Sequence, residues 1–278
     1  MSPRIPFIDP RYYQIAVLST LVVYGTTTLG FGIHWENALS IVVVALATQY
    51  LGTVLLTRSS FDPLSAIITS LSLTLLFRTD VALLAALAGF IAIASKFVIR
   101  VRGKHVFNPA NIAIVSLMFS SDRAWISSGQ WGSTTISAVL LIGLGLLVLT
   151  RAKRAETTIG FLVAFSSLLL ARAVWLGDPM SIPLHQLQNG ALLVFAFFMI
   201  SDPKTTPDTA TGRWCYAALV AALAYVIQFV FFIPNGAVIA LAFAAPLVPL
   251  IDLLSKGLHY QWRPSTAISQ TSKGVSNA

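Results

Sequence analysis

The chain consists of apolar stretches of membrane-spanning length that are separated by short polar breaks. The hydrocarbon core of a bilayer is about 30 Å thick, so a helix that crosses it needs about 20 apolar residues. The third and fifth stretches are short for a full crossing, and the fifth is compatible with a half-helix that has an extended lead-in. We predict ten transmembrane helices, at about 12–33, 37–57, 63–78, 81–100, 108–121, 133–150, 156–176, 186–201, 212–232 and 235–255.

Composition and charge agree with a membrane protein. Hydrophobic residues make up 56% of the chain and charged residues 10%, so the chain cannot form a mostly polar surface. Of the 18 Lys and Arg residues, only Arg78, Arg123 and Arg172 fall outside the termini and the even-numbered loops. The positive-inside rule then places both termini in the cytoplasm, and topology rather than a nucleic-acid partner explains the +8 charge. We expect an all-α polytopic protein of the plasma membrane, with one transmembrane domain at 1–264 and a disordered cytoplasmic tail at 265–278.

Two of the predicted helices begin with a broken segment, Phe-Asn-Pro-Ala-Asn at 107–111 and Phe-Ile-Pro-Asn-Gly at 232–236. They lie five helices apart, and a unit of five helices reverses its direction across the bilayer. We therefore predict an inverted 5+5 repeat with halves at about 12–121 and 133–255, in which both helix starts point inward. Free amides at helix starts attract polar or anionic groups, so these breaks indicate a ligand site.

The polar residues near the breaks have both binding and structural explanations. Asn108, Pro109 and Asn111 could hold a ligand, but asparagine beside proline also caps a helix. Asp202, Thr205 and Thr206 could contact a ligand or form a capping turn, and Asn235 with Gly236 could form a tight turn. No charged residue lies at the centre of a predicted helix, which argues against a buried proton relay or ion cage. The single cysteine excludes a disulfide within the chain and an all-cysteine metal site, and we predict no metal site.

Three segments, in order, resemble one family of electron-transport proteins. Ser-Asp-Pro-Lys-Thr-Thr-Pro-Asp-Thr-Ala-Thr-Gly at 201–212 follows Phe-Phe-Met-Ile at 197–200. This is similar to the Phe-Met, Thr/Ser-Asp-Pro, Thr-Ser-Pro and Thr-x-x-Gly run of the membrane protein RnfD of Rnf-type electron transport complexes and of its counterpart NqrB in sodium-pumping NADH:quinone reductase. Gly-Lys-His-Val-Phe-Asn-Pro-Ala-Asn at 103–111 resembles the family's Phe-Asn-Pro-Ala segment. Pro-Asn-Gly at 234–236 through Pro-Leu-Val-Pro-Leu-Ile-Asp at 246–252 resembles the family's Pro-Asp/Glu-Gly to Pro-Leu-Ile-Asp end.

The resemblance implies a ten-helix protein with inverted repeats that holds flavin in the membrane and passes electrons across it. Family members with covalent flavin mononucleotide (FMN) attach it to a threonine in an external Asp-Gly-x-Ser-Gly-Ala-Thr motif. Here the corresponding loop ends in Gly-Ser-Thr-Thr at 132–135 and lacks the leading Asp-Gly, so we predict no covalent flavin on Thr134 or Thr135. The sequences at 103–109 and 125–132 also resemble those of shorter RnfD-like proteins that are found with enediyne biosynthesis genes.

Three functional hypotheses follow. The first is a membrane electron-transport protein that binds a non-covalent flavin, riboflavin or FMN, between the repeats and works with other redox subunits. The second is a transporter or channel for a small, possibly flavin-like, solute that uses the same midplane site. The third is an assembly protein without a ligand of its own. Whether the chain is an enzyme is left open. The predicted binding residues are Asn108, Pro109, Asn111, Asp202, Thr205, Thr206, Asn235 and Gly236.

Overall fold

The computed structural model describes residues 9–57, 61–126, 142–145, 155–255, 257 and 260, and these residues are mostly helical. The predicted helix at 133–150 lies outside the described residues except for 142–145, which are helical. The predicted tail at 265–278 and the two threonines of the 132–135 segment also lie outside them. Within the described part the structure has two halves, which share one continuous apolar core.

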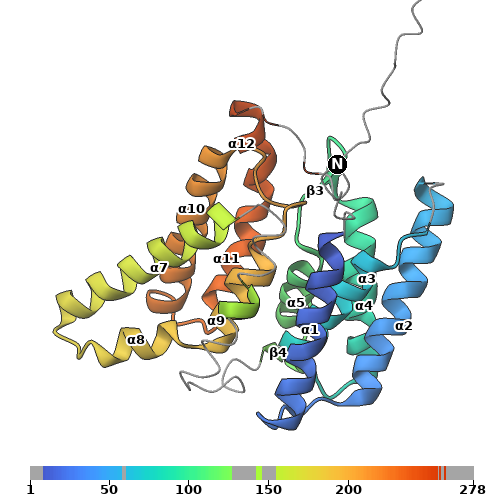
Figure 1. The fold of residues 1–278 in the computed structure, drawn as a ribbon, viewed down its shortest axis with the longest axis horizontal. Coiled ribbons are helices and arrows are strands. Elements are labelled where there is room, and N and C mark those ends of the chain that lie inside the picture. Colours follow the sequence, from blue (N-terminus) through green and yellow to red (C-terminus); the bar gives the residue numbers. More distant parts are fainter. Residues whose placement is uncertain are drawn as a thin grey trace, which may run out of the picture.

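The first half contains five helices and two small antiparallel sheets (Figure 1). The helices are α1 (Pro10–Thr27), α2 (Trp35–Gly52), which continues as the π-helix η1 (Thr53–Thr57), α3 (Leu64–Leu76), α4 (Ala82–Val98) and α5 (Pro109–Ser120). The strand β1 (Phe77–Thr79) pairs with β4 (Ala124–Ile126), and β2 (Arg100–Val101) pairs with β3 (Lys104–His105). The turn between β2 and β3 uses Arg102 at φ 52° and Gly103 at φ 80°, a left-handed conformation that favours glycine.

The second half begins with the long helix α7 (Ala155–Leu176). It continues with α8 (Ser181–Leu187), α9 (Gly190–Val194), the π-helix η3 (Phe195–Met199), α10 (Ala210–Phe229), α11 (Gly236–Ala244), the 3₁₀-helix η4 (Ala245–Leu247) and α12 (Val248–Leu254). The predicted helix at 186–201 corresponds to the α9–η3 segment, which begins four residues later than predicted. A bend of 48° separates α8 from the α9–η3 segment, and Asn189 caps α9 by accepting a hydrogen bond from the Ala191 amide at 2.8 Å.

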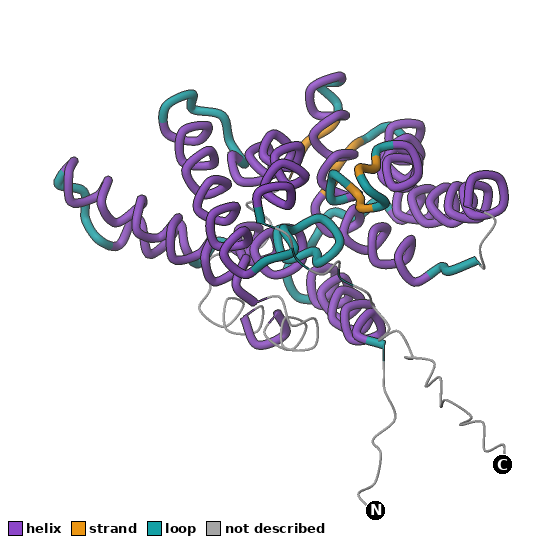
Figure 2. The backbone as a smooth tube through the Cα atoms, turned by 90° about the horizontal axis from the view of Figure 1, so that it is seen from above, coloured by secondary structure: helices purple, strands orange, loops and turns teal. Residues whose placement is uncertain are grey.

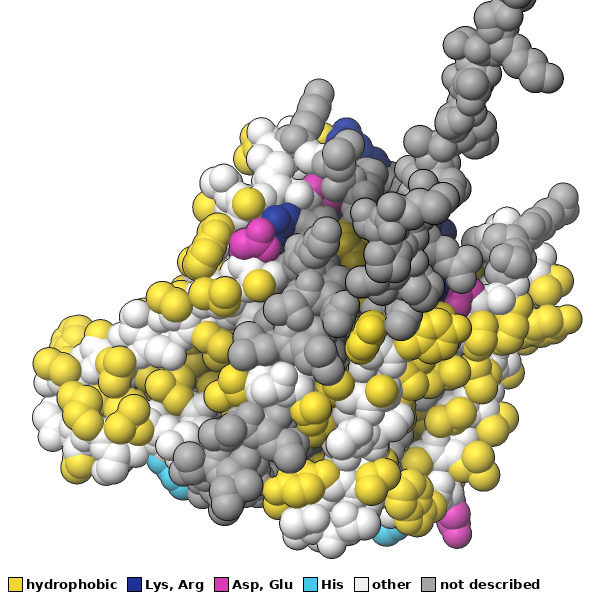
Figure 3. Space-filling view, in the orientation of Figure 1, with side chains coloured by type: hydrophobic (Ala, Val, Ile, Leu, Met, Phe, Trp, Pro, Cys, Tyr) yellow, Lys and Arg dark blue, Asp and Glu magenta, His cyan; other side chains and the backbone are white. Residues whose placement is uncertain are grey.

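The helices have the lengths and surfaces of a multi-pass membrane protein. Within the described residues, four segments are long and apolar enough to cross a bilayer, and the bent α8–η3 pair would be a fifth. The helices α3, α4 and α5 are apolar but shorter. Hydrophobic side chains cover the flanks of the molecule, while Lys and Arg gather towards the upper end in Figure 3. The count of ten membrane-spanning helices and the inverted relation of the halves stay predictions.

Close packing of small residues holds neighbouring helices together. A Cβ atom on Gly89 of α4 would lie 2.7 Å from the Ile41 carbonyl oxygen of α2, so only glycine permits this approach. The helices α1 to α5 lie on one side of the molecule and α7 to α12 on the other (Figures 1 and 2). The two sides meet where α5 contacts α11. These two helices begin with the broken segments at 107–111 and 232–236, which the sequence predicts as a ligand site.

Candidate functional site

The start of α5 joins the two halves. Asn108 is the N-cap residue of α5, and its Oδ1 accepts a hydrogen bond from the Asn111 amide at 3.0 Å. The next residue, Pro109, has no amide hydrogen to satisfy and fits the first helical position. The Nδ2 of Asn108 donates to the Met199 carbonyl oxygen at 3.2 Å and to Asp202 Oδ2 at 3.4 Å. One side chain therefore caps α5 and ties it to the end of η3.

Asn111 links the two broken helices directly. Its side chain is fully buried, and its Nδ2 donates to the Val238 carbonyl oxygen of α11 at 2.7 Å. Within the described residues, the Oδ1 of Asn111 receives no hydrogen bond. The same helices touch again near their ends, where the rings of Phe119 and Phe243 lie 6.5 Å apart between centroids. Asn111 thus serves the contact between the halves.

Asp202 organises the turn that follows η3. Its Oδ1 accepts from the Lys204 amide at 3.0 Å, and its carbonyl oxygen accepts from the amides of Thr205 and Thr206 at 3.1 and 3.2 Å. The hydroxyl of Thr205 donates to the same carbonyl oxygen at 3.3 Å. Both threonine side chains are buried within this turn. The contacts of Thr205 are those of a structural turn, whereas the buried Thr206 Oγ1 has no hydrogen-bond partner among the described residues.

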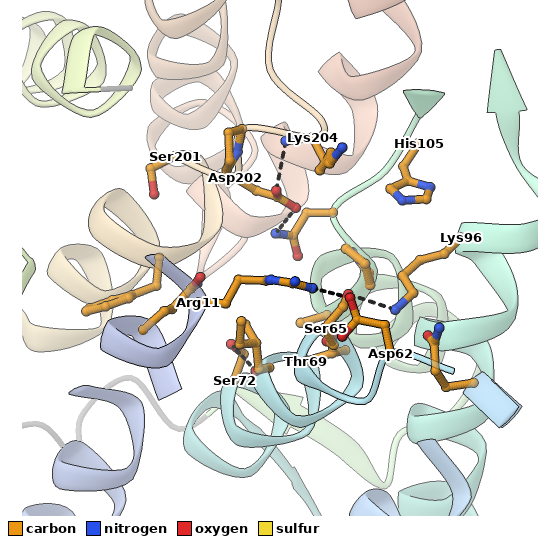
Figure 4. Close-up of a pocket in the computed structure, with 18 of the residues that line it drawn as sticks. Arg11, Asp62, Ser65, Thr69, Ser72, Lys96, His105, Ser201, Asp202 and Lys204 are labelled. Atoms are coloured by element: carbon orange, nitrogen blue, oxygen red, sulfur yellow. Dashed lines mark hydrogen bonds and ion pairs between the residues drawn. The ribbon is translucent and has the colours of Figure 1, made fainter. Parts of the chain in front are cut away.

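A cavity of about 240 Å³ opens beside Asn108 and Asp202. We call it the basic-end cavity, because it lies at the end of the molecule that carries β3 (Figure 1). Its walls come from the starts of α1 and α5, from α2 and α3, from the end of α4, from β3 and from the turn after η3, so both halves contribute. Figure 4 shows side chains from these elements converging on one space.

An ion-pair network forms one wall of the basic-end cavity. Arg11 is buried, and its Nη2 lies 2.7 Å from Asp9 Oδ2. The Nη1 of Arg11 makes a short contact with Asp62 Oδ2. Asp9 also caps α1, since its side chain accepts from the Arg11 amide. The network fixes the start of α1 against the segment that precedes α3.

Burial changes the proton affinity of the groups outside the helices that face the cavity. Burial and, to a smaller extent, the positive charges of Lys96, Arg100 and Lys204 together lower the pKa of His105 to about 4. Burial raises the pKa of the Asp202 carboxyl above its usual value, although the Lys204 amide and nearby lysines oppose this effect. Burial lowers the pKa of the Lys204 amine, which the charge of Asp202 counteracts. A neutral imidazole and a carboxyl that holds its proton more tightly therefore face the same space.

Asn235 lies at a second cavity of about 220 Å³, away from the basic-end cavity. Asn235 has a left-handed backbone, with φ 61°, and its side chain makes no capping bond. The wall of this cavity includes the carboxamides of Gln186, Asn189 and Gln228, so we call it the amide cavity. Gly236 serves packing, because a Cβ atom there would lie 2.6 Å from the Ala224 carbonyl oxygen of α10.

A three-residue ion cluster lines a further cavity of about 210 Å³, which shares His105 with the basic-end cavity. Lys104 of β3 bonds Asp208 Oδ1 at 3.0 Å and Asp252 Oδ2 at 2.8 Å. Asp252 also accepts from the Asp208 amide at 2.8 Å. The β2–β3 hairpin of the first half is therefore fastened to α12 and to the loop before α10 of the second half.

Sequence comparison identifies the family to which this architecture belongs. Residues 121–260, half of the chain, match the family model described as "NQR2, RnfD, RnfE family". The chain belongs to this family. The match confirms the resemblance found in the three segments, although the Asn108 segment of this NQR2/RnfD/RnfE-family protein lies before the matched residues.

Curated relatives of this NQR2/RnfD/RnfE-family protein are named as the D component of an ion-translocating oxidoreductase complex. The protein from Erwinia tasmaniensis is 31% identical over 136 residues, which are 48% of this chain and 37% of the relative. The protein from Citrobacter koseri is 31% identical over 134 residues, with the same two coverages. The protein from Cronobacter sakazakii is 30% identical over 164 residues, 58% of this chain and 45% of the relative. The matched segments thus span less than half of these relatives.

The structure assembles part of the predicted site and adds residues that the sequence pattern did not indicate. Asn108, Pro109 and Asp202 line the basic-end cavity, and Asn111 lies directly behind them. Further polar residues line it, among them Arg11, Asp62, Ser65, Lys96, His105 and Lys204. The charge count above assigned Lys96 to the cytoplasmic side, although this lysine falls within the last turns of the predicted helix at 81–100. A charged residue inside a membrane helix points to a protein-lined cavity.

Proposed function

We propose that this protein is a membrane electron-transport subunit that binds a non-covalent flavin in the basic-end cavity. The observation that carries the proposal is the cavity itself, which lies between the two halves and beside the Asn108–Asp202 contact. Membership of the NQR2/RnfD/RnfE family supports a role in electron transport. The relatives' name, which places them in an ion-translocating oxidoreductase complex, supports assembly with other redox subunits.

The residues around the cavity suit a flavin. A flavin ring carries an N–H donor and several oxygen and nitrogen acceptors along its polar edge. Asp202 can accept from the ring, and Ser65 can donate to it. His105 has an Nδ1 that is buried and receives no hydrogen bond within the described residues. When bound, the flavin would supply the reversible uptake and release of electrons. The protein would bind and orient the ring, exclude water and hold protons on Asp202.

The orientation in the membrane belongs to the same proposal. The basic end carries Lys96, Arg100, Lys104 and Lys204, and positive charge favours the cytoplasmic side. The flavin would then lie near the cytoplasmic surface, where a soluble redox partner or a neighbouring membrane protein can reach it. We propose no covalent attachment to Thr134 or Thr135, because the preceding Asp-Gly is missing.

The absorption spectrum of the purified protein tests this proposal. Protein extracted in mild detergent should show a flavin spectrum, and denaturation should release the flavin into the soluble fraction. The intact polypeptide should then have its unmodified mass. A colourless protein that takes up neither riboflavin nor FMN on incubation would overturn the proposal, and a polypeptide with the added mass of FMN would overturn the non-covalent attachment.

One observation favours transport of a small solute as a second candidate function. The basic-end cavity and the amide cavity lie beside the starts of α5 and α11, and the Asn111–Val238 hydrogen bond lies at the contact between these helices. Cavities on both sides of a contact between repeats suit alternating access. Uptake of radiolabelled riboflavin into proteoliposomes would support this function, while electron transfer without uptake would exclude it.

A further inference from the structure

Lys96 is a buried cation with no carboxylate partner among the described residues. Its side chain is 5% exposed, and its Nζ donates to the Ser65 hydroxyl at 2.9 Å. No carboxylate oxygen in the described part of the chain lies within 4 Å of this Nζ. An ammonium group has three donors, so two remain beyond the bond to Ser65. A buried charge is costly unless it is paired, and Lys96 faces the basic-end cavity (Figure 4).

The other charges around the cavity do not compensate Lys96. Among the described residues that line the cavity, the cations are Arg11, Lys96, Arg100 and Lys204, and the carboxylates are Asp62 and Asp202. Asp62 pairs with Arg11, which Asp9 neutralises further. Asp202 is engaged by the Asn108 carboxamide and by the Lys204 amide. Arg11 and Asp62 compensate each other. The remaining cations, Lys96, Arg100 and Lys204, are opposed by the single carboxylate of Asp202, so the cavity carries an excess of positive charge.

The start of α5 adds to this positive potential. Pro109 and Ala110, the first residues of the helix, line the cavity. Aligned peptide dipoles place partial positive charge at the N-terminus of a helix, where anions bind. The helix start and the buried Lys96 therefore act on the same space and favour the same kind of ligand.

We propose that the basic-end cavity binds a phosphate monoester, whose negative charge neutralises Lys96. A phosphate monoester carries about two negative charges at neutral pH and three acceptor oxygens, which match the excess cations better than a single carboxylate does. The proposal deepens the proposed function and rests on it, because FMN carries such a group and riboflavin does not. Inorganic phosphate offers the same chemistry without a flavin, so the anion site can be tested separately.

Binding measurements on purified protein with Lys96→Met test the proposal. FMN should bind the unmodified protein about tenfold to a hundredfold more tightly than riboflavin, as expected for a charge-assisted hydrogen bond. Lys96→Met should remove this preference and leave riboflavin binding unchanged, and Lys96→Arg should keep it. Arg123→Met serves as the control, since Arg123 is exposed and pairs with Asp80 away from the cavity.

Thermal unfolding with inorganic phosphate gives an independent result. Phosphate should raise the Tm of the unmodified protein and not that of Lys96→Met. Without any anion, Lys96→Met should raise the Tm, because it removes an uncompensated buried charge. Equal affinity for the two flavins together with no phosphate effect would overturn the anion site but leave flavin binding intact. A phosphate effect that depends on Lys96 in a protein that binds neither flavin would retain the anion site and overturn the flavin proposal.

Discussion

Asn108 has two structural roles that single substitutions can separate. Its oxygen caps α5, and its nitrogen bonds the end of η3 and Asp202. Asn108→Ala removes both and should lower the free energy of unfolding by about 2 kcal/mol, since a cap and a buried hydrogen bond are each worth about 1 kcal/mol. Asn108→Ser keeps a capping oxygen and should recover about half of the loss. Denaturation of both variants in detergent would show this order, and equal losses would mean that the cap contributes nothing.

His105 should make the protein sensitive to mild acid. Its folded-state pKa of about 4 lies below the ordinary value of 6.5, so the unfolded chain takes up the proton first. This contribution to stability is complete above about pH 6.5 and is lost as the pH falls towards 4. Each unit between the two pKa values corresponds to about 1.4 kcal/mol. When Tm is measured against pH, the Tm of His105→Gln should fall less than that of the unmodified protein between about pH 6.5 and pH 4. Parallel pH profiles for the two proteins would contradict the lowered pKa of His105.

The residues of the site differ in how far the sequence alone could predict them. Asn108, Pro109 and Asp202 stand beside helix breaks, where proline and turn chemistry indicate a site directly. Arg11, Asp62 and His105 lie outside the helices predicted from the sequence, and nothing in the sequence shows that they converge. Only the packing of α1, α3 and α4 brings them to one cavity. For Asn235 the helix break indicated a site residue, but the structure places this residue at the amide cavity and not at the basic-end cavity.

The pair α2–α4 depends on Gly89. Replacing Gly89 by Ala puts a methyl group within 2.7 Å of the Ile41 carbonyl oxygen, so the helices must move apart. Overpacking of this kind costs about 1–3 kcal/mol, and Gly89→Val should cost more than Gly89→Ala. Gly32→Ala is the matched control, because a Cβ atom there has no neighbour within 4 Å. Thermal unfolding should show a lower Tm for both Gly89 variants only, and a Gly89→Ala protein as stable as Gly32→Ala would contradict the close packing.

The hairpin β2–β3 should be held by charge. Lys104→Met removes the ammonium group that bonds the side chains of Asp208 and Asp252, which are 2% and 12% exposed. Loss of one partner from a buried ion cluster costs about 3–5 kcal/mol. The triple variant Lys104→Met, Asp208→Asn, Asp252→Asn also removes the two negative charges and should recover most of this stability. Arg123→Met breaks an exposed pair and should change the Tm little. A triple variant no more stable than Lys104→Met would show that the charges are not the cause.

Apolar length predicted where helices occur better than where they break. The predicted start at 108 agrees with α5, which begins at Pro109 after an N-cap asparagine. The predicted helix at 186–201 corresponds to α9 and η3, which begin later, at Gly190, because Asn189 caps a new helix there. The Gln-Asn-Gly segment at 188–190 carries the sequence signal for this later start, since asparagine is a favoured N-cap residue. The small sheets, two or three residues to a strand, are below what alternation can indicate.

The two halves of the molecule meet at a few polar contacts within a continuous apolar core. Membrane insertion, helix content and family could be predicted from hydropathy and three motifs, and the family match bears out the motifs. The relative orientation of the two halves in the membrane could not be predicted, because weak similarity between apolar segments does not show whether the halves run in the same or in opposite directions. The inverted repeat therefore stays a prediction, while the contact of α5 with α11 through Asn111 and Val238 is a feature of the structure.

The flavin content of a cavity-filling variant tests the central proposal most directly. Ser72 of α3 lines the basic-end cavity, and Ser167 of α7 is exposed on the opposite half. Flavin released by denaturation from Ser72→Phe and Ser167→Phe would be measured per polypeptide, with Tm as a check of folding. We predict one flavin per chain in the unmodified protein and in Ser167→Phe, and none in folded Ser72→Phe. Full flavin content in Ser72→Phe, or no flavin in any of the three proteins, would contradict the proposal.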